Sequence, residues 1–407
     1  MSSWHLNNYL ASPSLLDPIP TWFVKQFTDL FAPLFCHIVN ASFCSHTFPS
    51  SLRESIVFPL LEKPNLDCEN LKNYRPVSNI QFLSKVLEKV VDCQLDSHLS
   101  LNGLYEKYQS GFRRFHSVET ALICILNDIY CSRDEGKFTA LCLIDLSSAF
   151  DTLDHCILIE NLKRNFGFGT PVTNWLQSYL SNRFQQVVLN DVRSKKKATC
   201  HGIPQGSILG PKIFSLYLMP LYSIFKKNGV KFHGYADDTQ FYIETSESTL
   251  QKTKDKIVNV LTQITKWLFS YKLKINAEKT EIIIFGHNHT VELKIDVNVI
   301  CSSLSVRDLG VLLDCNLSFN DHFTKICKEC YLLLRNISKN RKCMDTDTCN
   351  RIICSLVLSR LNFCCVLYNG LPKKALARLQ RVQTYAVKIV SMQPRHAHVT
   401  PLLKQFK

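Results

Sequence analysis

The sequence lacks the features that mark membrane, secreted and repeat proteins. None of its apolar runs is long enough to span a bilayer, and it contains neither internal repeats nor low-complexity segments. Residues 1–6 (MSSWHL) do not provide the basic start and apolar core of a secretory signal peptide. These absences favour an intracellular globular protein with no membrane partner.

Cysteine is plentiful, but its spacing lacks a metal-binding or disulfide pattern. The 18 cysteines are scattered along the chain. Cys327 and Cys330 form a CxxC pair, but the cysteines that follow do not supply the second pair that a zinc site needs, and the histidines show no paired spacing on a helix. The cysteines are therefore interpreted as reduced and mostly buried small side chains.

Acidic residues are scarce relative to basic ones. There are 34 Asp and Glu against 48 Lys and Arg, which gives a net charge of +14. This excess favours a polyanionic partner, either nucleic acid or an acidic membrane surface, although a generically basic protein has the same charge balance. A hydrophobic content of 46% with 20% charged residues is ordinary for a globular fold. The 407 residues are enough for about two or three subdomains.

Two stretches carry carboxylates at the ends of apolar runs. Residues 232–243 (FHGYADDTQFYI) place Asp237 and Asp238 between two aromatic and apolar segments, which predicts strand, turn and strand. Residues 141–151 (LCLIDLSSAFD) predict a buried strand that ends at Asp145. An Asp-Asp pair alone is more often an ordinary turn, so the second stretch is needed to favour a site.

A strand-end aspartate beside an aspartate hairpin is a minimal two-metal site. Nucleotidyl transfer is assisted by two Mg²⁺ ions about 4 Å apart, which take oxygen ligands from a few carboxylates, phosphates and water. The residues themselves thus indicate Asp145, Asp237 and Asp238 as metal ligands, with a backbone carbonyl from Leu146. Asp151 and Asp154 are interpreted as helix capping or local pairing.

The remaining chain predicts helices and strands in alternation. Pro59 indicates an edge position for the strand Ile56–Leu61, and Pro33 predicts a kink or break in the N-terminal helix Trp22–Val39. Ser117 predicts the N-cap of the helix that follows it. Further predicted elements are helix Ile80–Leu99, strand Lys137–Leu146, a helix with Thr170 as cap and Pro171 next, a basic hairpin over 185–197, helix Lys212–Phe225, helix Leu250–Trp267, strand Ile282–Gly286, a short strand or turn over 309–314 and a basic helical remainder from 319 to 407.

Three other features have a functional and an ordinary interpretation. Glycines in residues 202–211 (GIPQGSILGP) allow a close approach of the backbone to a ligand. Pro76 keeps Arg75 extended, but the motif alone favours a surface arginine. The basic residues 193–197 are equally consistent with phosphate contact and with a solvated turn.

Three motifs occur in a fixed order and resemble the central motifs of reverse transcriptases. They are IDLSSAFDTLDH at 144–155, GIPQGS at 202–207 and YADD at 235–238. The flanking motifs NYRP at 73–76, QSGFR at 109–113, NAEKT at 276–280 and LGV at 309–311 resemble the non-LTR (LINE-type) retrotransposon branch. The resemblance covers nearly the whole chain.

The resemblance implies an α+β fold of the right-hand polymerase type. It implies an N-terminal helical extension at 1–50 and a reverse transcriptase domain at 51–318, with fingers at 51–137 and a palm with an antiparallel sheet at 138–318. A helical thumb or C-terminal region follows at 319–407. The implied function is RNA-directed DNA polymerase, which adds dNTPs to a DNA 3′ end on an RNA template with two Mg²⁺ ions, or Mn²⁺ as the alternative. Template RNA and a DNA primer or target are the implied partners, within a ribonucleoprotein in nucleus and cytoplasm.

The resemblance also implies a role for each motif residue. Asp145, Asp237, Asp238 and the Leu146 carbonyl hold the metals. Phe150 lies under the sugar and excludes a 2′-hydroxyl, Gln205 contacts the incoming nucleotide, and Gly206 lets the backbone approach the template. Arg75 grips the triphosphate, and Lys279 stands near the pyrophosphate as a general acid. Residues 309–311 form the primer grip.

The sequence departs from the family pattern in a few places. Arg114-Phe115 stands where a Pro-Gly type turn is frequent, and Lys212 replaces an apolar residue. The segment before the fingers is too short for the endonuclease domain of such elements, and residues 395–403 resemble a segment that normally continues. We therefore expect a piece of a longer retrotransposon protein. Two alternatives are a non-catalytic nucleic-acid-binding relic and an RNA-templated RNA polymerase, and Phe150 with the flanking motifs argues against the latter.

Overall fold

The computed structural model describes residues 15–63, 66–147, 149–189, 192–287, 291–295, 298–394 and 396–398. Outside these ranges lie residues 1–14 of the predicted N-terminal extension, Asn190 and Asp191 of the predicted basic hairpin, and residues 399–407. In the described part, no helix combines the length and the apolar character that crossing a membrane requires.

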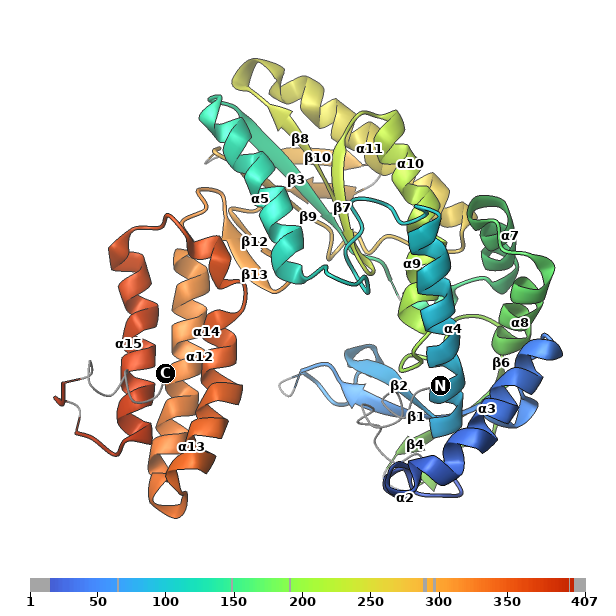
Figure 1. The fold of residues 1–407 in the computed structure, drawn as a ribbon. Helices are drawn as coiled ribbons and strands as arrows, with labels where there is room; N and C mark the ends of the chain where they lie inside the picture. Colours follow the sequence, from blue (N-terminus) through green and yellow to red (C-terminus); the bar gives the residue numbers. More distant parts are fainter. Residues whose placement is uncertain are drawn as a thin grey trace. The chain divides into compact units, whose positions relative to one another are not determined.

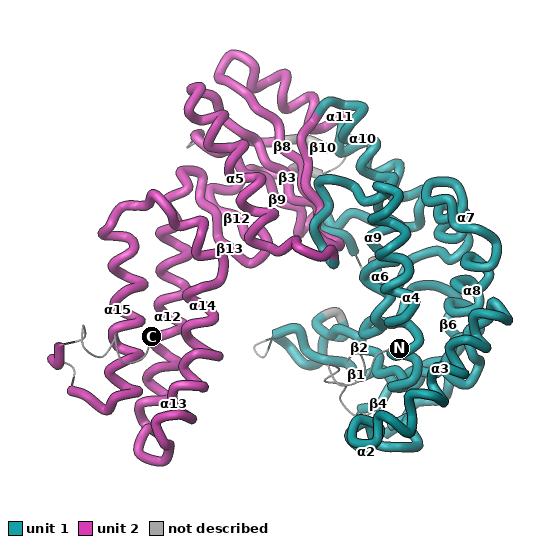
Figure 2. The backbone as a smooth tube through the Cα atoms, viewed as in Figure 1, with its two compact units in different colours: residues 1–112, 145–229, 260–276 teal, residues 113–144, 230–259, 277–407 magenta. Residues whose placement is uncertain are grey.

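The chain forms two compact units, each built from segments that are distant in sequence (Figure 2). Unit 1 comprises residues 1–112, 145–229 and 260–276, and unit 2 comprises residues 113–144, 230–259 and 277–407. Because both units are discontinuous, the predicted linear boundaries of fingers, palm and thumb stay predictions.

Unit 1 contains a five-stranded sheet and a set of surrounding helices. The strand order is β2-β1-β4-β5, with β6 paired to β4, and β1 runs parallel to β4 and antiparallel to β2. Its elements are α2 (Thr21–Gln26), α3 (Thr28–Cys44), β1 (Glu54–Leu61), β2 (Tyr74–Ile80), α4 (Phe82–Leu101), α6 (Ala149–Thr152), α7 (His155–Phe166), α8 (Thr170–Leu180), β4 (Arg183–Leu189), β5 (Val192–Arg193), β6 (Lys197–Thr199), α9 (Gly210–Leu218) and α10 (Tyr222–Lys227).

Three local predictions for unit 1 are wrong. Strand β1 is not an edge strand; β4 pairs with it only as far as Val57, so Pro59, which lies beyond, interrupts no ladder on that side. The N-terminal helix breaks at Phe27 rather than at Pro33, which removes only the hydrogen bond to the carbonyl of Asp29 in the first turn of α3. The N-cap of α8 is Gly169, and Thr170 is already helical.

Unit 2 contains a four-stranded antiparallel sheet in the order β7-β8-β3-β9. This confirms the predicted α+β class with an antiparallel sheet. The elements are α5 (Val118–Asp134), β3 (Phe138–Ile144), β7 (Lys231–Tyr235), β8 (Asp238–Thr245), the first half of α11 (Leu250–Ser270), β9 (Glu281–Phe285), β10 (Glu292–Ile295), β11 (Asn298–Cys301), β12 (Ser305–Asp308), β13 (Val311–Asp314), α12 (Asn320–Lys339), α13 (Thr346–Ile353), α14 (Ser359–Asn362) and α15 (Lys373–Val390).

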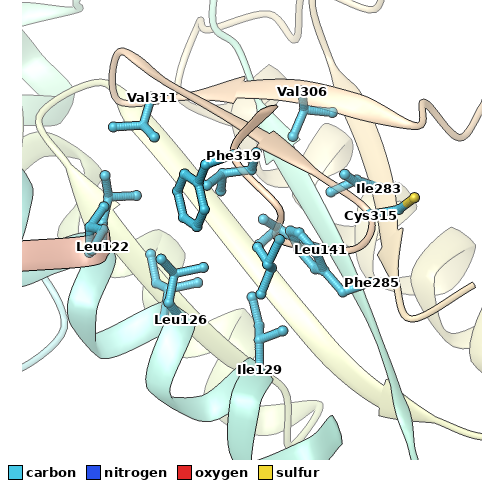
Figure 3. Packing of buried hydrophobic residues seen from close by; sticks show 14 of the residues in the cluster. Leu122, Leu126, Ile129, Leu141, Ile283, Phe285, Val306, Val311, Cys315 and Phe319 are labelled. Atoms are coloured by element: carbon cyan, nitrogen blue, oxygen red, sulfur yellow. The ribbon is translucent and has the colours of Figure 1, made fainter. Parts of the chain in front are cut away.

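One hydrophobic core joins the sheet of unit 2 to the start of its C-terminal helices. Helix α5 packs against β3 (Figure 1) and begins at Ser117 with a capping box, which confirms the predicted cap. Its apolar face meets Leu141 of β3 and Phe319, which precedes α12 (Figure 3). A second core holds α12, α13 and α15 together. The predicted helical character of the C-terminal region is thus confirmed up to Val390.

Candidate active site

The paired aspartates lie in a tight hairpin between β7 and β8. Tyr235 pairs with Asp238, so Ala236 and Asp237 alone form the turn. Ala236 has a φ of 60°, which is the positive value that the first turn position of such hairpins requires. Because alanine avoids this region, the turn is strained at the residue before the two carboxylates. The predicted strand, turn and strand are confirmed, and both Asp237 and Asp238 are exposed.

Strand β3 ends beside the start of β8. Ile144 pairs with Thr239, the residue after Asp238. Asp145 is the next residue after Ile144 and is half-buried. The antiparallel register therefore brings the end of β3, which leads into Asp145, to the strand end that carries the hairpin carboxylates.

The residues after β3 are tied to the segment before Ala277. Asp145 accepts a hydrogen bond through its carbonyl from the Asn276 N–H at 2.9 Å, and the Ser147 N–H donates to the Lys274 carbonyl at 3.0 Å. Leu146 lies between these two bonds in an antiparallel bridge with Ile275. In such a pair the carbonyl of the middle residue points away from the partner strand, so the Leu146 carbonyl is directed away from Ile275.

The loop that carries Gln205 and Gly206 is held against β2. The Ser78 N–H donates to the Gln205 carbonyl at 2.6 Å. Gly206 has a φ of 120°, and a Cβ added there would lie 2.5 Å from the Ser78 carbonyl oxygen. Glycine is therefore required at 206 by the close approach of the protein's own backbone.

A second anchor of this loop is Asp151. The Gln205 Nε2 donates to both carboxylate oxygens of Asp151, at 3.1 and 3.2 Å. Burial raises the pKa of Asp151, and the bond from Gln205 opposes that rise. The predicted local pairing of Asp151 is confirmed, as is the capping role of Asp154, which accepts from two N–H groups at the start of α7.

Phe150 and Phe214 stack with ring centroids 4.7 Å apart and an interplanar angle of 26°. Phe214 is fully buried in α9, whereas Phe150 is only partly buried. The Phe150 ring is therefore held on a rigid support.

Sequence reasoning missed the buried carboxylate of Glu88 on α4. Its oxygens accept from the Ser84 hydroxyl at 3.0 Å and from the N–H groups of Ile208 and Leu209 at 2.7 and 3.2 Å. Glu88 thus caps α9 and fixes the end of the loop that carries Gln205. The available signal is its spacing, since Glu88 falls four residues after Ser84 on the apolar face of the predicted helix.

Lys212, which departs from the family pattern, has a structural role. Its ammonium lies 2.8 Å from carboxylate oxygens of both Asp92 and Asp96, and the side chain is 8% exposed. The two carboxylates on α4 compensate the buried charge on α9. The basic residue at this position is therefore accommodated by its contacts with α4.

Arg75 and Lys279 are both exposed in their units. Arg75 is held extended in β2, as predicted, and its Nε lies 3.1 Å from a Glu62 carboxylate oxygen. Lys279 lies in the turn before β9, two residues from Glu281, which pairs with Leu143 near the end of β3. No contact in the described residues assigns either side chain a ligand.

A cavity of about 350 Å³ adjoins the hairpin within unit 2. It is lined by residues of β3, β8 and the β12–β13 hairpin, including Asp238, Gln240 and Asp308. Asp308 accepts one hydrogen bond, from the Gln240 Nε2 at 3.2 Å, and burial raises its pKa to about 7. Sequence reasoning missed this acid, although its spacing of two from buried Val306 on β12 placed it on the inward face.

The donor chemistry of the hairpin and the end of β3 suits hard divalent cations, because the nearby groups are carboxylate and carbonyl oxygens. Within the described residues, no three His, Cys, Asp or Glu side chains form a group that could hold a metal ion by themselves. Enzymes of the reverse transcriptase family generally use divalent metals.

Two of the known proteins to which this chain is similar are named as RNA-directed DNA polymerases. The chain is 24% identical over 377 residues to a probable RNA-directed DNA polymerase from transposon BS of Drosophila melanogaster, covering 90% of this chain and 41% of that protein. It is 26% identical over 310 residues to the RNA-directed DNA polymerase from mobile element jockey of the same organism, covering 74% of this chain and 33% of that protein. The chain thus spans less than half the length of these relatives.

Among solved structures, apo telomerase from Candida tropicalis, truncated from its C-terminal domain, aligns with a TM-score of 0.46 and 16% identity. The alignment covers 66% of this chain and 54% of that one. Residues 61–313, more than half of the sequence, match the family described as reverse transcriptase (RNA-dependent DNA polymerase), and the chain belongs to that family.

Proposed function

We propose that this chain is the RNA-directed DNA polymerase of a LINE-type retrotransposon. The pairing of Ile144 with Thr239 is the observation that carries the proposal, because it brings the end of β3, which leads into Asp145, to the strand end that carries Asp237 and Asp238. Family membership supports the reaction class. The names of the two relatives, polymerases of a transposon and of a mobile element, support the kind of element.

In this proposal Asp145, Asp237, Asp238 and the Leu146 carbonyl hold two Mg²⁺ ions, with Mn²⁺ as the alternative. The direction of the Leu146 carbonyl, away from Ile275, supports its inclusion. The ions, when bound, lower the pKa of the primer 3′-hydroxyl and neutralise charge on the triphosphate. The strained turn at Ala236 contributes by holding Asp237 and Asp238 in one orientation.

The nucleotide is positioned by four further residues. Phe150, supported from behind by Phe214, excludes a 2′-hydroxyl and selects dNTPs over rNTPs. Gln205, restrained by Asp151, contacts the nucleotide. Arg75 leaves its ion pair with Glu62 and binds the triphosphate instead. Lys279 protonates the leaving pyrophosphate. The position of Gly206 against Ser78 supports a role in packing the loop. In the proposal, the template approaches the side of the Gly206 backbone that faces away from Ser78.

The partners are template RNA, a DNA primer or target, and dNTPs. The net charge of +14 supports binding through phosphates, which weakens as salt is raised. We place the protein in a ribonucleoprotein of nucleus and cytoplasm, with fingers at 51–137, palm at 138–318 and thumb at 319–407.

Primer extension on poly-rA with an oligo-dT primer tests the proposal. We expect the wild type to incorporate dTTP with Mg²⁺, and Asp237→Asn to lose about 10²–10³-fold in rate, because an electrostatic contact to the reacting groups is removed. Asp347→Asn is the matched control, since Asp347 is exposed on α13 and forms an ion pair with Arg351 four residues on. Absence of incorporation by folded wild type that binds RNA contradicts the proposal and supports the non-catalytic relic. In the same assay, Phe150→Val is expected to gain use of rNTPs, and unchanged selectivity removes Phe150 from the sugar site.

A further inference from the structure

Helices α12 and α15 pack side by side in unit 2 (Figure 1). Side chains of these two helices line a groove outside the candidate active site. The groove has a volume of about 600 Å³. It is lined by Tyr331, Arg335, Arg381, Thr384, Tyr385 and Lys388. Two aromatic rings and three cationic side chains therefore share one surface, and none of them has a role in the function proposed above.

The two tyrosine rings are neighbours across the groove. Their centroids lie 6.1 Å apart with an interplanar angle of 45°. Tyr331 is 40% exposed, whereas Leu334 and Val382, each three residues from a tyrosine on the same helices, fill the core beneath. The exposed part of Tyr331 thus offers a flat apolar surface that the folded core does not use.

The charged side chains among the described residues that line the groove are all basic. Helix α15 carries five Lys and Arg residues and no Asp or Glu over its sequence KKALARLQRVQTYAVKIV. Glu329 on α12 is engaged by Arg360 at 2.6 Å. In the described part of the chain neither Arg335 nor Arg381 forms an ion pair, and both are exposed. Their guanidinium groups are therefore available to an anion.

We propose that this groove binds single-stranded RNA, with bases stacked on Tyr331 and Tyr385 and phosphates bound by Arg335, Arg381 and Lys388. Aromatic faces interleaved with cations are the means by which proteins hold unpaired strands, because every base has a face to stack and every nucleotide a phosphate. Bases in a duplex have no free face, so an unpaired strand fits better than a duplex. The choice of RNA over DNA rests on the proposed function, which requires an RNA template.

Fluorescence anisotropy with the full chain tests the aromatic half of the proposal. The probe is labelled oligo-rU of about 12 nucleotides, within the usual range for such sites. Binding is measured in EDTA without dNTPs, on a chain that carries Asp237→Asn. We expect Tyr331→Ala to weaken binding about tenfold and Tyr331→Phe to restore it, because the stacking ring returns. Tyr130→Ala is the matched control, since Tyr130 on α5 is 39% exposed in the same unit.

The salt dependence of the same binding tests the cationic half. Each lost phosphate contact lowers the slope of log affinity against log salt by about 0.7 for a single strand. We expect this change for Arg335→Gln and again for Arg381→Gln. Arg351→Gln removes the same charge from a guanidinium that is paired with Asp347, and we expect the slope to stay unchanged.

Comparison of variants and of probes in this binding assay gives the outcomes that overturn the proposal. If Tyr331→Ala folds, by circular dichroism and thermal unfolding, yet binds oligo-rU as tightly as Tyr130→Ala, the groove does not stack bases. If Tyr331→Ala weakens the binding of an RNA–DNA duplex as much as the binding of oligo-rU, the site does not select unpaired strands. If oligo-dT binds more tightly than oligo-rU, RNA is excluded as the ligand. Because no step here needs catalysis, failure of primer extension leaves this test intact, and an inert groove leaves the polymerase result intact.

Discussion

Two buried carboxyl groups, Glu88 in unit 1 and Asp308 in unit 2, lie near residues of the proposed site but differ in their hydrogen bonds and in the charges around them. Both are nearly inaccessible, at 0% and 3% exposed, and burial raises the pKa of each. Glu88 accepts three hydrogen bonds and lies in the field of Arg183, which opposes the rise. Asp308 accepts a bond from Gln240 and has Asp238 nearby, which adds to the rise.

The difference teaches what each acid does. Glu88 has a donor for both oxygens, so it acts as a fixed cap that joins α4 to the loop before α9. The Oδ2 of Asp308 has no hydrogen-bond partner among the described residues, and the side chain lines the cavity beside the hairpin. An acid with incomplete bonding changes its protonation more readily than one with a full set of donors.

Removal of Glu88 tests the first half of this comparison and has the largest expected effect. Glu88→Ala leaves the N–H groups of Ile208 and Leu209 without their acceptor and removes a negative charge near Arg183. We expect the free energy of unfolding to fall by about 3–5 kcal/mol, measured by urea denaturation, as when one partner of a buried charged network is removed.

The control for Glu88 is Glu160→Ala. Glu160 is exposed on α7 and pairs with Arg164 four residues later. Exposed pairs of this kind contribute less than about 1 kcal/mol. If Glu88→Ala is no more destabilising than Glu160→Ala, Glu88 does not hold the loop, and the contrast with Asp308 fails.

The pH dependence of stability tests the second half. The pKa of Asp308 is raised to about 7 in the folded chain, above the usual value near 4, so the folded state binds this proton more tightly than the unfolded state. Its contribution is fully present below about pH 4 and is lost as the pH rises through about 7. We expect the free energy of unfolding to fall over this interval by up to about 4 kcal/mol more in wild type than in Asp308→Asn.

Urea denaturation from pH 4 to pH 8 measures this difference. EDTA is included so that no divalent ion neutralises Asp238. Asp347→Asn, an exposed acid of unit 2, is the control and is expected to keep the wild-type slope. Identical slopes for wild type and Asp308→Asn would mean that Asp308 is solvated or fully bonded, and the two acids would no longer differ.

The same two acids show how far the sequence could predict the structure. Local patterns sufficed for the hairpin that carries Asp237 and Asp238, for the strand before Asp145 and for the cap at Ser117, because each depends on residues that are close in sequence. The partners of Glu88 and Lys212 could not be predicted from the sequence. The N–H of Ile208 lies 120 positions from Glu88, and Asp96 lies 116 positions from Lys212, so only the fold brings these groups together.

Pairing across distant segments also explains the wrong prediction for Pro59. Pro59 indicates an edge strand when considered alone, but β4 joins the other half of β1 and makes it internal. The contact of Gly206 with the carbonyl of Ser78, 128 positions earlier (206 minus 78), could not be predicted from the sequence either, and its approach to the template stays a prediction. The residues of the proposed site could be named from the sequence because the proposed reaction requires particular chemical groups, whereas their supports can be built in many ways.

Glu88→Gln has the smallest expected effect and separates hydrogen bonding from charge in the comparison. Glutamine keeps the shape of Glu88; its carbonyl oxygen can accept from the N–H groups of Ile208 and Leu209, and its amide can donate to the Ser84 hydroxyl. It loses only the attraction of the negative charge for Arg183, so we expect urea denaturation to show a loss of about 1 kcal/mol. Because burial raises the pKa of Glu88, wild-type stability falls as the pH rises whereas the Gln variant lacks this titration, so the loss is expected to be no smaller at pH 5 than at pH 8. A loss equal to that of Glu88→Ala would mean that Glu88 supports the loop through its charge alone. The contrast with Asp308 would then lie in neighbouring charges rather than in the number of hydrogen-bond donors.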